Sequence, residues 1–157
     1  MTGNVSPRHN PGLNRFRYKL VENEREFQGA IEVRYTVFVH EQGVHEAIEA
    51  DGADHEAVHT VVLADRDVIG TARVRFLSPS EAKIERMAVL KPYRGQGIGH
   101  GILAFLSGEL EKRHIKRIVL HAQYPTIMFY KSCGFHPHGR PFLEAGMKHL
   151  AMERQLL

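Results

Sequence analysis

The sequence predicts a single domain of the mixed α/β class, in which strands come first and a strand–helix–strand unit follows. The chain has 157 residues, of which 43% are hydrophobic and 25% are charged, and this suits one globular domain. Two β-rich runs are separated by only three polar residues, as in an antiparallel hairpin. Further along, a glycine-rich turn joins another β-rich run to an amphipathic helix. No linker or internal repeat divides the chain.

The amino-terminal third is predicted to hold a tail, a strand, a helix and a loop. Residues 1–15 lack periodicity and are rich in proline, glycine and asparagine, so we expect a loose tail ahead of a domain that spans residues 16–157. Alternating apolar residues predict a strand over 16–21. An amphipathic helix that ends near residue 40 is predicted by apolar residues at helical spacing: Phe27, Ile31, Tyr35 and Phe38. The acidic stretch 41–56 is expected to be a loop with one helical turn.

The remaining elements alternate between strands and helices. The hairpin consists of strands 57–64 and 68–77, and a third strand covers 83–90. After the glycine-rich turn at 92–99, a helix extends to about residue 113. Three elements complete the domain: a strand over 117–121, a short helix over 126–133 that ends at a left-handed Gly134, and a last strand over 148–155.

Composition excludes several classes of function. A single cysteine cannot form an internal disulfide, which favours a reducing compartment, so we expect a cytoplasmic protein. No apolar run approaches the roughly 18–20 residues of a membrane-spanning helix. Lys and Arg number 21 against 18 Asp and Glu, a small excess for a nucleic-acid binder. No metal is expected, because His55 and His59 have helical spacing but His59 falls within a predicted strand. We therefore expect no nucleic acid and no membrane as partners.

The glycine-rich turn Tyr93–Gly101 carries the densest chemical signal. Glycines at the start of a helix let unpaired backbone N–H groups approach an anion closely, which suits a phosphate or a pyrophosphate. No Gly-Lys-Ser/Thr follows, as a Walker loop requires, and the third glycine of a dinucleotide fingerprint is out of register. The motif that fits is Arg/Gln-x-x-Gly-x-Gly/Ala, with Arg94, Gly97 and Gly99.

A second motif, Phe129-Tyr130-Lys131-Ser132-Cys133-Gly134-Phe135, follows the next predicted strand. With both motifs in this order, the sequence resembles the GNAT superfamily of acyl-CoA-dependent N-acetyltransferases from about Phe16 to the carboxyl terminus. Segments 37–43 and 142–152 resemble its ElaA-like subgroup. The resemblance implies a mixed central sheet of about six to seven strands, largely antiparallel, with a central splayed parallel pair and flanking helices.

The resemblance implies direct transfer of an acetyl group from acetyl-CoA to a primary amine of a small-molecule acceptor, without a metal. The backbone of Met87, Ala88 and Val89 would pair with the pantetheine arm. The pyrophosphate would lie on the glycine loop, formed by Arg94, Gly95, Gln96, Gly97, Ile98 and Gly99. The resemblance also leaves a homodimer open, as in relatives that pair through strand edges.

Four side chains are candidates for the proton transfers. Tyr130 matches the family's tyrosine that protonates the coenzyme A thiolate, and a phenol is a suitable donor to it. For the general base, His149 ranks first because the carboxyl-terminal segment matches and a histidine titrates near neutral pH. Glu85 ranks second, since many relatives carry a carboxylate there, and His121 ranks third.

The acceptor is the least determined part of the prediction. The acidic loop residues Glu46, Glu49, Asp51 and Asp54 are placed to attract a cationic amine, but a solvated loop explains them equally well. Two alternative functions stay open. One is a catalytically silent acyl-CoA-binding module, which needs neither Tyr130 nor a base, and the other is a protein or peptide N-acetyltransferase.

Overall fold

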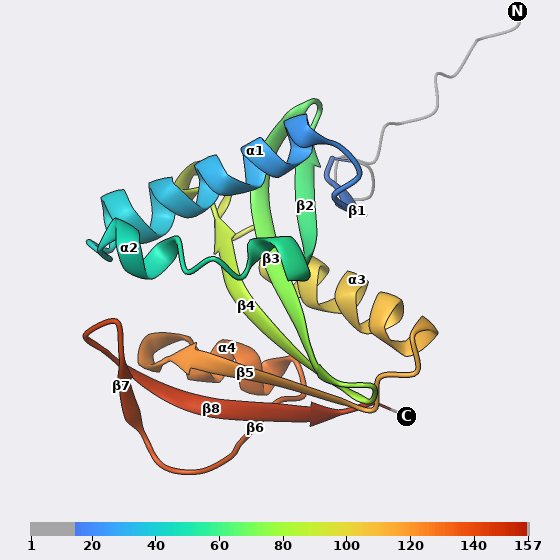
Figure 1. The fold of residues 1–157 in the computed structure, drawn as a ribbon, viewed down its shortest axis with the longest axis vertical. Helices are drawn as coiled ribbons and strands as arrows, with labels where there is room; N and C mark the ends of the chain where they lie inside the picture. Colours follow the sequence, from blue (N-terminus) through green and yellow to red (C-terminus); the bar gives the residue numbers. More distant parts are fainter. Residues whose placement is uncertain (1–14, 157) are drawn as a thin grey trace, which may run out of the picture.

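The computed structural model describes residues 15–156, so almost all of the predicted tail lies outside the described residues. An eight-stranded sheet runs through the domain in the order β1-β2-β3-β4-β5-β8-β6, with β7 paired to β8 (Figure 1). The strands are β1 (Arg17–Leu20), β2 (Val58–Ala64), β3 (Asp67–Ser78), β4 (Glu81–Val89), β5 (Arg117–Gln123), β6 (His136–Pro137), β7 (Phe142–Glu144) and β8 (Met147–Gln155).

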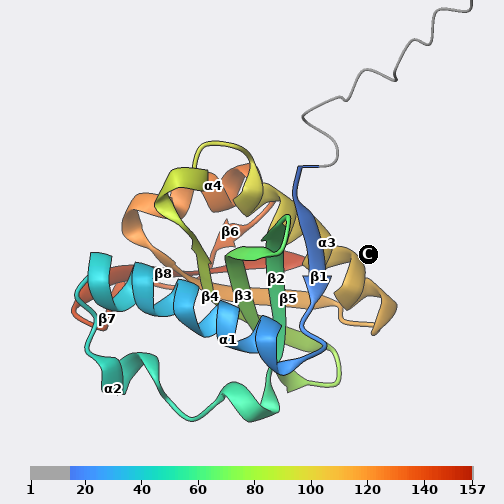
Figure 2. The ribbon, with the colours of Figure 1, turned by 90° about the horizontal axis from the view of Figure 1, so that it is seen from above.

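Helices flank this sheet on both faces. The α-helices are α1 (Glu24–Arg34), α2 (Glu46–Glu49), α3 (Ile98–Lys112) and α4 (Ile127–Ser132). A π-helix, η1 (Tyr35–Glu41), continues α1, and three 3-10 turns are η2 (Asp54–Glu56), η3 (Lys91–Tyr93) and η4 (Tyr124–Thr126). Figure 2 shows α1 across one face of the sheet and α3 on the other. None of the helices within residues 15–156 is long and apolar enough to cross a membrane.

One pair of neighbouring strands is parallel, and it separates early. β4 and β5 are in register only from Glu81–Ile84 and Arg117–Leu120, whereas β4 continues to Val89 and β5 to Gln123. The other pairings are antiparallel. This confirms the expected mixed sheet with a central splayed parallel pair. The structure has eight strands where six to seven were expected, because two very short strands are included: β6 has two residues and β7 has three.

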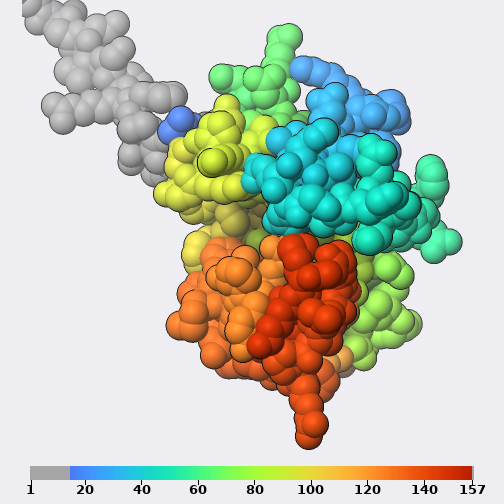
Figure 3. Space-filling model, turned by 90° about the vertical axis from the view of Figure 1, so that its left-hand side faces the viewer, coloured from blue at the N-terminus to red at the C-terminus, as the bar shows by residue number. Residues whose placement is uncertain are grey.

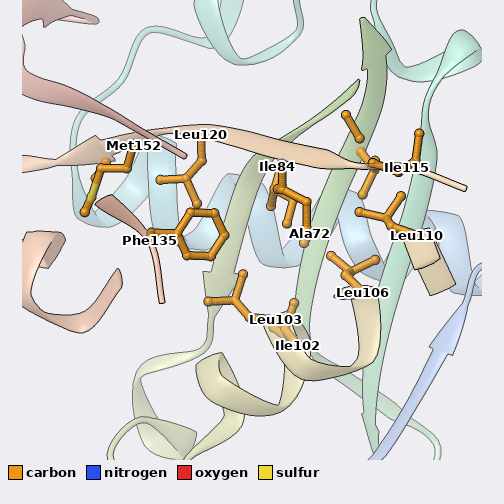
Figure 4. Packing of buried hydrophobic residues seen from close by; sticks show 14 of the residues in the cluster. Ala72, Ile84, Ile102, Leu103, Leu106, Leu110, Ile115, Leu120, Phe135 and Met152 are labelled. Carbon is orange, nitrogen blue, oxygen red and sulfur yellow. The ribbon is translucent and has the colours of Figure 1, made fainter. Parts of the chain in front are cut away.

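The main core lies between α3 and the sheet. Ile102, Leu103, Leu106 and Leu110 of α3 pack with buried strand residues and with Phe135 (Figure 4). Successive strand residues point to opposite faces, so each strand that gives an apolar side chain to this core gives its neighbours to the other face. On β4, Ile84 enters the core and Lys83 and Glu85 face away from it. The sheet thus separates an apolar face from a charged one.

Local signals explain where α1 begins and how it ends. Asn23 caps the helix by accepting a hydrogen bond from the Glu26 N–H at 2.9 Å, and the Glu26 carboxylate accepts one from the Glu22 N–H at 2.9 Å. The helix then widens into η1 and ends at Glu41, next to the predicted end. The loop that follows holds one short α-helix, α2, as expected, and also the 3-10 turn η2, which the sequence prediction lacked. Short π-helical segments are frequent at functional sites, and Val37 and Phe38 of η1 line the cavity described below.

The sequence prediction missed the β7–β8 hairpin, having only a strand over 148–155. β7 pairs with the start of β8 through a two-residue turn, Ala145-Gly146, with both residues at positive φ (49° and 73°). The usual signal for this turn is Asn-Gly or Asp-Gly, because asparagine and aspartate tolerate the left-handed conformation. With alanine at the first position, the sequence does not indicate the hairpin.

The packing of α3 on β1 requires a glycine at position 101. A Cβ added there would lie 2.1 Å from the Tyr18 hydroxyl oxygen, whereas one added at Gly108 of the same helix meets no atom within 4 Å. We expect Gly101→Ala to lower the free energy of unfolding by about 1–3 kcal/mol through overpacking. Gly108→Ala should raise it by about 0.5–1 kcal/mol through helix propensity. Urea denaturation measures both, and equal stability of the two variants would contradict this account of the packing.

Candidate active site

The separation of β4 from β5 opens a cavity of about 720 Å³. It lies where the amino-terminal half of the domain meets the carboxyl-terminal half, which Figure 3 shows in blue to cyan and in orange to red. Its lining comes from η1, the α2 loop, β3, β4, β5, α4 and the β7–β8 hairpin. Gln42 and Gln123 connect the two halves, since the Gln123 amide donates a hydrogen bond to the Gln42 side-chain oxygen at 2.8 Å.

The glycine loop presents the start of α3 beside this cavity. Gly97 is the N-cap of α3 with φ of 79°, and no side chain caps the helix there. The first backbone hydrogen bond runs from the Gly101 N–H to the Gly97 oxygen (3.0 Å), so the N–H groups of the first turn point out of the helix. A second cavity of about 230 Å³ lies over this loop. The partial positive charge at the start of a fifteen-residue helix favours an anion in it.

The other loop residues have three different roles: one allows a backbone conformation, one allows close packing and one carries a charge. Gly95 also has a positive φ, of 78°. Gly99 is required by packing, because a Cβ there would lie 2.9 Å from the Phe129 ring. The Arg94 guanidinium donates from Nε to the Val89 carbonyl at 2.8 Å and pairs with the Glu41 carboxylate at 2.9 Å. Arg94 therefore ties the loop both to β4 and to the end of η1.

The backbone of Met87, Ala88 and Val89 borders the cavity. On one edge Ala88 and Val89 are in register with β3, and the other edge has no strand partner after Ile84. A β-bulge precedes these residues: Arg86 has φ of 51°, and three steps on β4 face two steps on β3. The bulge bends β4 away from β5 and leaves this edge facing the cavity.

Tyr130 also lines the cavity, from the short helix α4. Its ring packs edge-on against Phe129 (5.0 Å between centroids) and Phe135 (6.0 Å). Burial raises the pKa of the Tyr130 phenol, so the hydroxyl is protonated at neutral pH. The structure thus brings a phenolic proton donor into the cavity that the open edge of β4 borders.

Two histidines of the cavity wall share one carboxylate. His121 of β5 has Nδ1 at 3.0 Å from one oxygen of Glu144, and His149 of β8 has Nε2 at 3.6 Å from the other. His149 is 5% exposed, and its Nδ1 donates to the Met147 carbonyl at 2.8 Å. Phe142 stacks on His149 and meets His121 edge-on. The hairpin that the sequence prediction missed therefore supplies both Glu144 and Phe142 to the site.

Glu85 faces the same cavity but is surrounded by cations. One of its oxygens accepts hydrogen bonds from Arg73 at 2.5 and 3.0 Å, and the other lies 3.1 Å from Lys83 and 3.4 Å from Arg75. Burial favours the neutral carboxyl, but the hydrogen bonds from Arg73 and the charge of Lys83 outweigh it and lower the pKa of Glu85. A carboxylate with a lowered pKa is a weaker base.

The acidic loop is neutralised by buried arginines rather than left free for a substrate. Arg34 pairs with Glu49 at 2.5 Å and with Asp54 at 2.8 Å, and Arg73 pairs with Asp51 at 2.8 Å and with Asp54 at 3.1 Å. Both guanidinium side chains are 1% exposed. Three of the four acidic residues expected to attract an amine are thus partners of these arginines.

Sequence reasoning missed the cations of this wall. Arg73 and Arg75 alternate with the core residue Val74 on β3, and this alternation was the available signal that both share the face opposite the core. Glu144 had no comparable signal, because its role depends on the hairpin. Within residues 15–156, no group of three or more His, Cys, Asp or Glu is arranged to hold a metal ion.

The fold, the glycine loop and the open strand edge are the features of an acyltransferase of the GNAT type. A family model described as "Acetyltransferase (GNAT) domain" matches residues 22–156. The chain therefore belongs to the GNAT acetyltransferase family, and this membership supports an acyltransferase activity.

Relatives and solved structures agree with this assignment. The chain is 34% identical over 134 residues to the uncharacterized N-acetyltransferase YjcF of Bacillus subtilis, covering 85% of this chain and 95% of YjcF. Escherichia coli ElaA superposes with a TM-score of 0.77 at 22% identity, over 88% of this chain and 99% of ElaA. A GNAT acetyltransferase of Elizabethkingia anophelis with acetyl-CoA bound superposes with a TM-score of 0.72 at 14% identity, over 91% and 99%. At these identities the two structures show the fold.

The buried arginines make a prediction about stability. We expect Arg73→Met to lower the free energy of unfolding at pH 7 by about 3 kcal/mol, because it leaves Asp51 and Glu85 without their main partner and Asp54 with Arg34 alone. Hydrogen bonds from Arg73 lower the pKa of Asp51, and those from Arg34 and Arg73 lower that of Asp54 against the opposing effect of burial. The stabilisation is therefore complete above the unfolded pKa of about 4 and is lost progressively at lower pH.

The difference between wild type and Arg73→Met should accordingly shrink when urea denaturation is repeated at about pH 3. Lys112→Met removes a solvent-exposed ion pair with Glu109 and serves as the control, with little change expected at either pH. A difference that stays constant between pH 7 and pH 3 would mean that the arginine stabilises by packing alone.

Proposed function

We propose that this protein transfers the acetyl group of acetyl-CoA directly to a primary amine of a small-molecule acceptor. The observation that carries the proposal is the meeting of three features at one place. They are the unpaired edge of β4, the uncapped start of α3 and the buried phenol of Tyr130. The first two fit an extended ligand that ends in phosphates, and the third fits a leaving group that needs a proton.

The coenzyme fits the residues expected from the sequence. The open edge of β4 between Met87 and Val89 offers backbone groups to an extended pantetheine arm, as a neighbouring strand would. Residues 95–99 offer the N–H groups of the loop to the pyrophosphate, and Arg94 adds positive charge beside them. The Val89 carbonyl accepts a hydrogen bond from Arg94, which ties the loop to the strand at this edge.

The chemistry requires two proton transfers, one from the protein to the leaving sulfur and one from the acceptor nitrogen to the protein. Acetyl-CoA supplies an activated acyl thioester and a thiolate leaving group. Tyr130 holds its proton at neutral pH and donates it to that sulfur as the carbon–sulfur bond breaks. A base removes the proton that the acceptor nitrogen loses when it forms the amide.

The base belongs to the histidine pair on β5 and β8. A carbonyl oxygen only accepts, so His149 carries its proton on Nδ1 and its basic nitrogen is Nε2, beside Glu144. His121 donates from Nδ1 to Glu144, which leaves its Nε2 as the basic nitrogen. We keep His149 as the first candidate and place His121 next. Glu85 follows, because its cationic partners lower its pKa.

The release of free thiol from acetyl-CoA with a panel of primary amines tests the activity. We expect Tyr130→Phe to reduce kcat by about 10²–10⁴-fold and to leave the affinity for acetyl-CoA nearly unchanged, because only proton donation is lost. Tyr124→Phe is the matched control, since Tyr124 is exposed and outside the cavity lining. An unchanged rate for Tyr130→Phe would remove this residue from the mechanism. Binding of acetyl-CoA without thiol release from any amine would indicate a catalytically silent module.

The pH dependence of kcat identifies the base. We expect His149→Ala to abolish the acidic limb of the profile, because that limb reports protonation of the base. Glu85→Gln should retain the limb, and His136→Ala, a change of an exposed histidine on β6, is the control. Loss of the limb in His121→Ala alone would assign the base to His121. Its retention in both histidine variants would exclude the pair.

A further inference from the structure

The charged wall of the cavity points to the chemistry of the acceptor. We propose that the acceptor amine also carries a carboxylate, and that Arg75 and Lys83 bind this carboxylate. This inference rests on the proposed acetyl transfer and names its substrate class, amino acids and related short amino carboxylates. Both side chains line the large cavity.

Arg75 and Lys83 lie directly opposite each other on neighbouring strands. They are register partners in the antiparallel pair of β3 and β4, so their side chains leave the sheet on the same face, next to each other. Like charges in this position repel, and such a pair is destabilising unless an anion lies between them. Among the described residues, only the carboxylate of Glu85 contacts the pair, and it does so through one oxygen.

Glu85 is the one carboxylate of the described residues that the structure places against this pair. A single oxygen of Glu85 serves both cations, at 3.1 Å from Lys83 and 3.4 Å from Arg75. Its other oxygen is held by Arg73 at 2.5 Å. Glu85 thus shares its single charge among three cations, and Arg73 alone of the three has further carboxylate partners among the described residues, Asp51 and Asp54. The Arg75 side chain remains 44% exposed and that of Lys83 20% exposed, so both have room for a second anionic partner.

The other acidic residues of this wall pair with Arg34, Arg73 and Arg86 rather than with Arg75 or Lys83. Asp51 pairs with Arg73 and Arg86, and Glu49 pairs with Arg34 and Arg86 at 2.5 and 2.8 Å. Each carboxylate there contacts at least one guanidinium. An acceptor with two or more cationic groups, such as a polyamine, would find no unpaired carboxylate on this wall. An acceptor with an anionic group would relieve the repulsion between Arg75 and Lys83.

The position of this pair relative to the histidines sets the size of the acceptor. Lys83 is in register with Val119 of β5, and His121 lies two residues further along the same face. Two residues of a strand span roughly 7 Å, and the strands diverge beyond Leu120. A carboxylate held by Arg75 and Lys83 thus lies within a few bonds of an amine at the histidine pair. A short amino carboxylate spans this distance.

The test compares acceptors that differ only in charge. Glycine, β-alanine, γ-aminobutyrate and 5-aminovalerate are each assayed against the corresponding primary amide, which keeps the amine and removes the negative charge. We expect at least one acid to have a kcat/KM about 10–100-fold above that of its amide. Arg75→Gln and Lys83→Gln should each reduce this ratio about tenfold or more, and Lys83→Arg should restore it. Lys112→Gln, on the distal end of α3, should leave the ratio unchanged.

Binding of the same pairs in the presence of coenzyme A separates this inference from the activity itself. Calorimetric titration should show tighter binding of the acid than of the amide in wild type but not in Arg75→Gln. Preference for the acid without thiol release would support the carboxylate site and refute the acetyl transfer. Acetylation of acids and amides at equal rates, or a ratio unaffected by both glutamine variants, would overturn the inference while the transfer stands. Neither binding nor turnover of any pair would overturn both.

Discussion

The site depends on one constraint in the sheet: two parallel strands that hydrogen bond over four residues and then separate. β4 and β5 are joined by register from Glu81 to Ile84, and a bulge at Arg86 bends β4 away from its neighbour. Backbone groups left without a strand partner need another one, because unpaired polar groups are costly to bury. The separation therefore creates both the cavity and an edge that suits an extended ligand. The glycine loop and α3 follow directly from the end of this strand.

The bent strand is held from the side opposite the core by buried charges. Arg34 of α1 and Arg73 of β3 connect the helix, the acidic loop and β4 through Glu49, Asp51, Asp54 and Glu85. Buried ion pairs often add little net stability, but the loss of one partner leaves an uncompensated charge, so they fix the arrangement of the groups that they join. In this domain they fix the acidic loop over one side of the cavity. They also neutralise its negative charge, so the cavity wall is cationic at Arg75 and Lys83.

Most of the fold was predictable because its signals are local. The alternation in β2 and β3, the helical spacing in α1 and α3, and the glycine turn between β4 and α3 each lie within a short window of sequence. The two motifs that carry the family resemblance are local in the same sense. The β7–β8 hairpin escaped because its turn, Ala145-Gly146, lacks the residue that normally marks it. The candidate site was correspondingly incomplete, since Glu144 and Phe142 arrive with that hairpin.

The sequence by itself determined that a strand, a glycine-rich turn and an amphipathic helix follow one another and that Tyr130 follows the next strand. Spacing and conformational preference encode these features within a few residues. Only the tertiary structure decided which charges remain free. Arg34 meets Asp54 and Arg73 meets Glu85 across separations of 20 and 12 residues, and His121 meets Glu144 across 23. Ion pairing depends on distance in space, and no local pattern records it. For that reason the sequence left open whether the acidic loop attracts a cationic amine or is solvated, whereas in the fold its carboxylates pair with buried arginines.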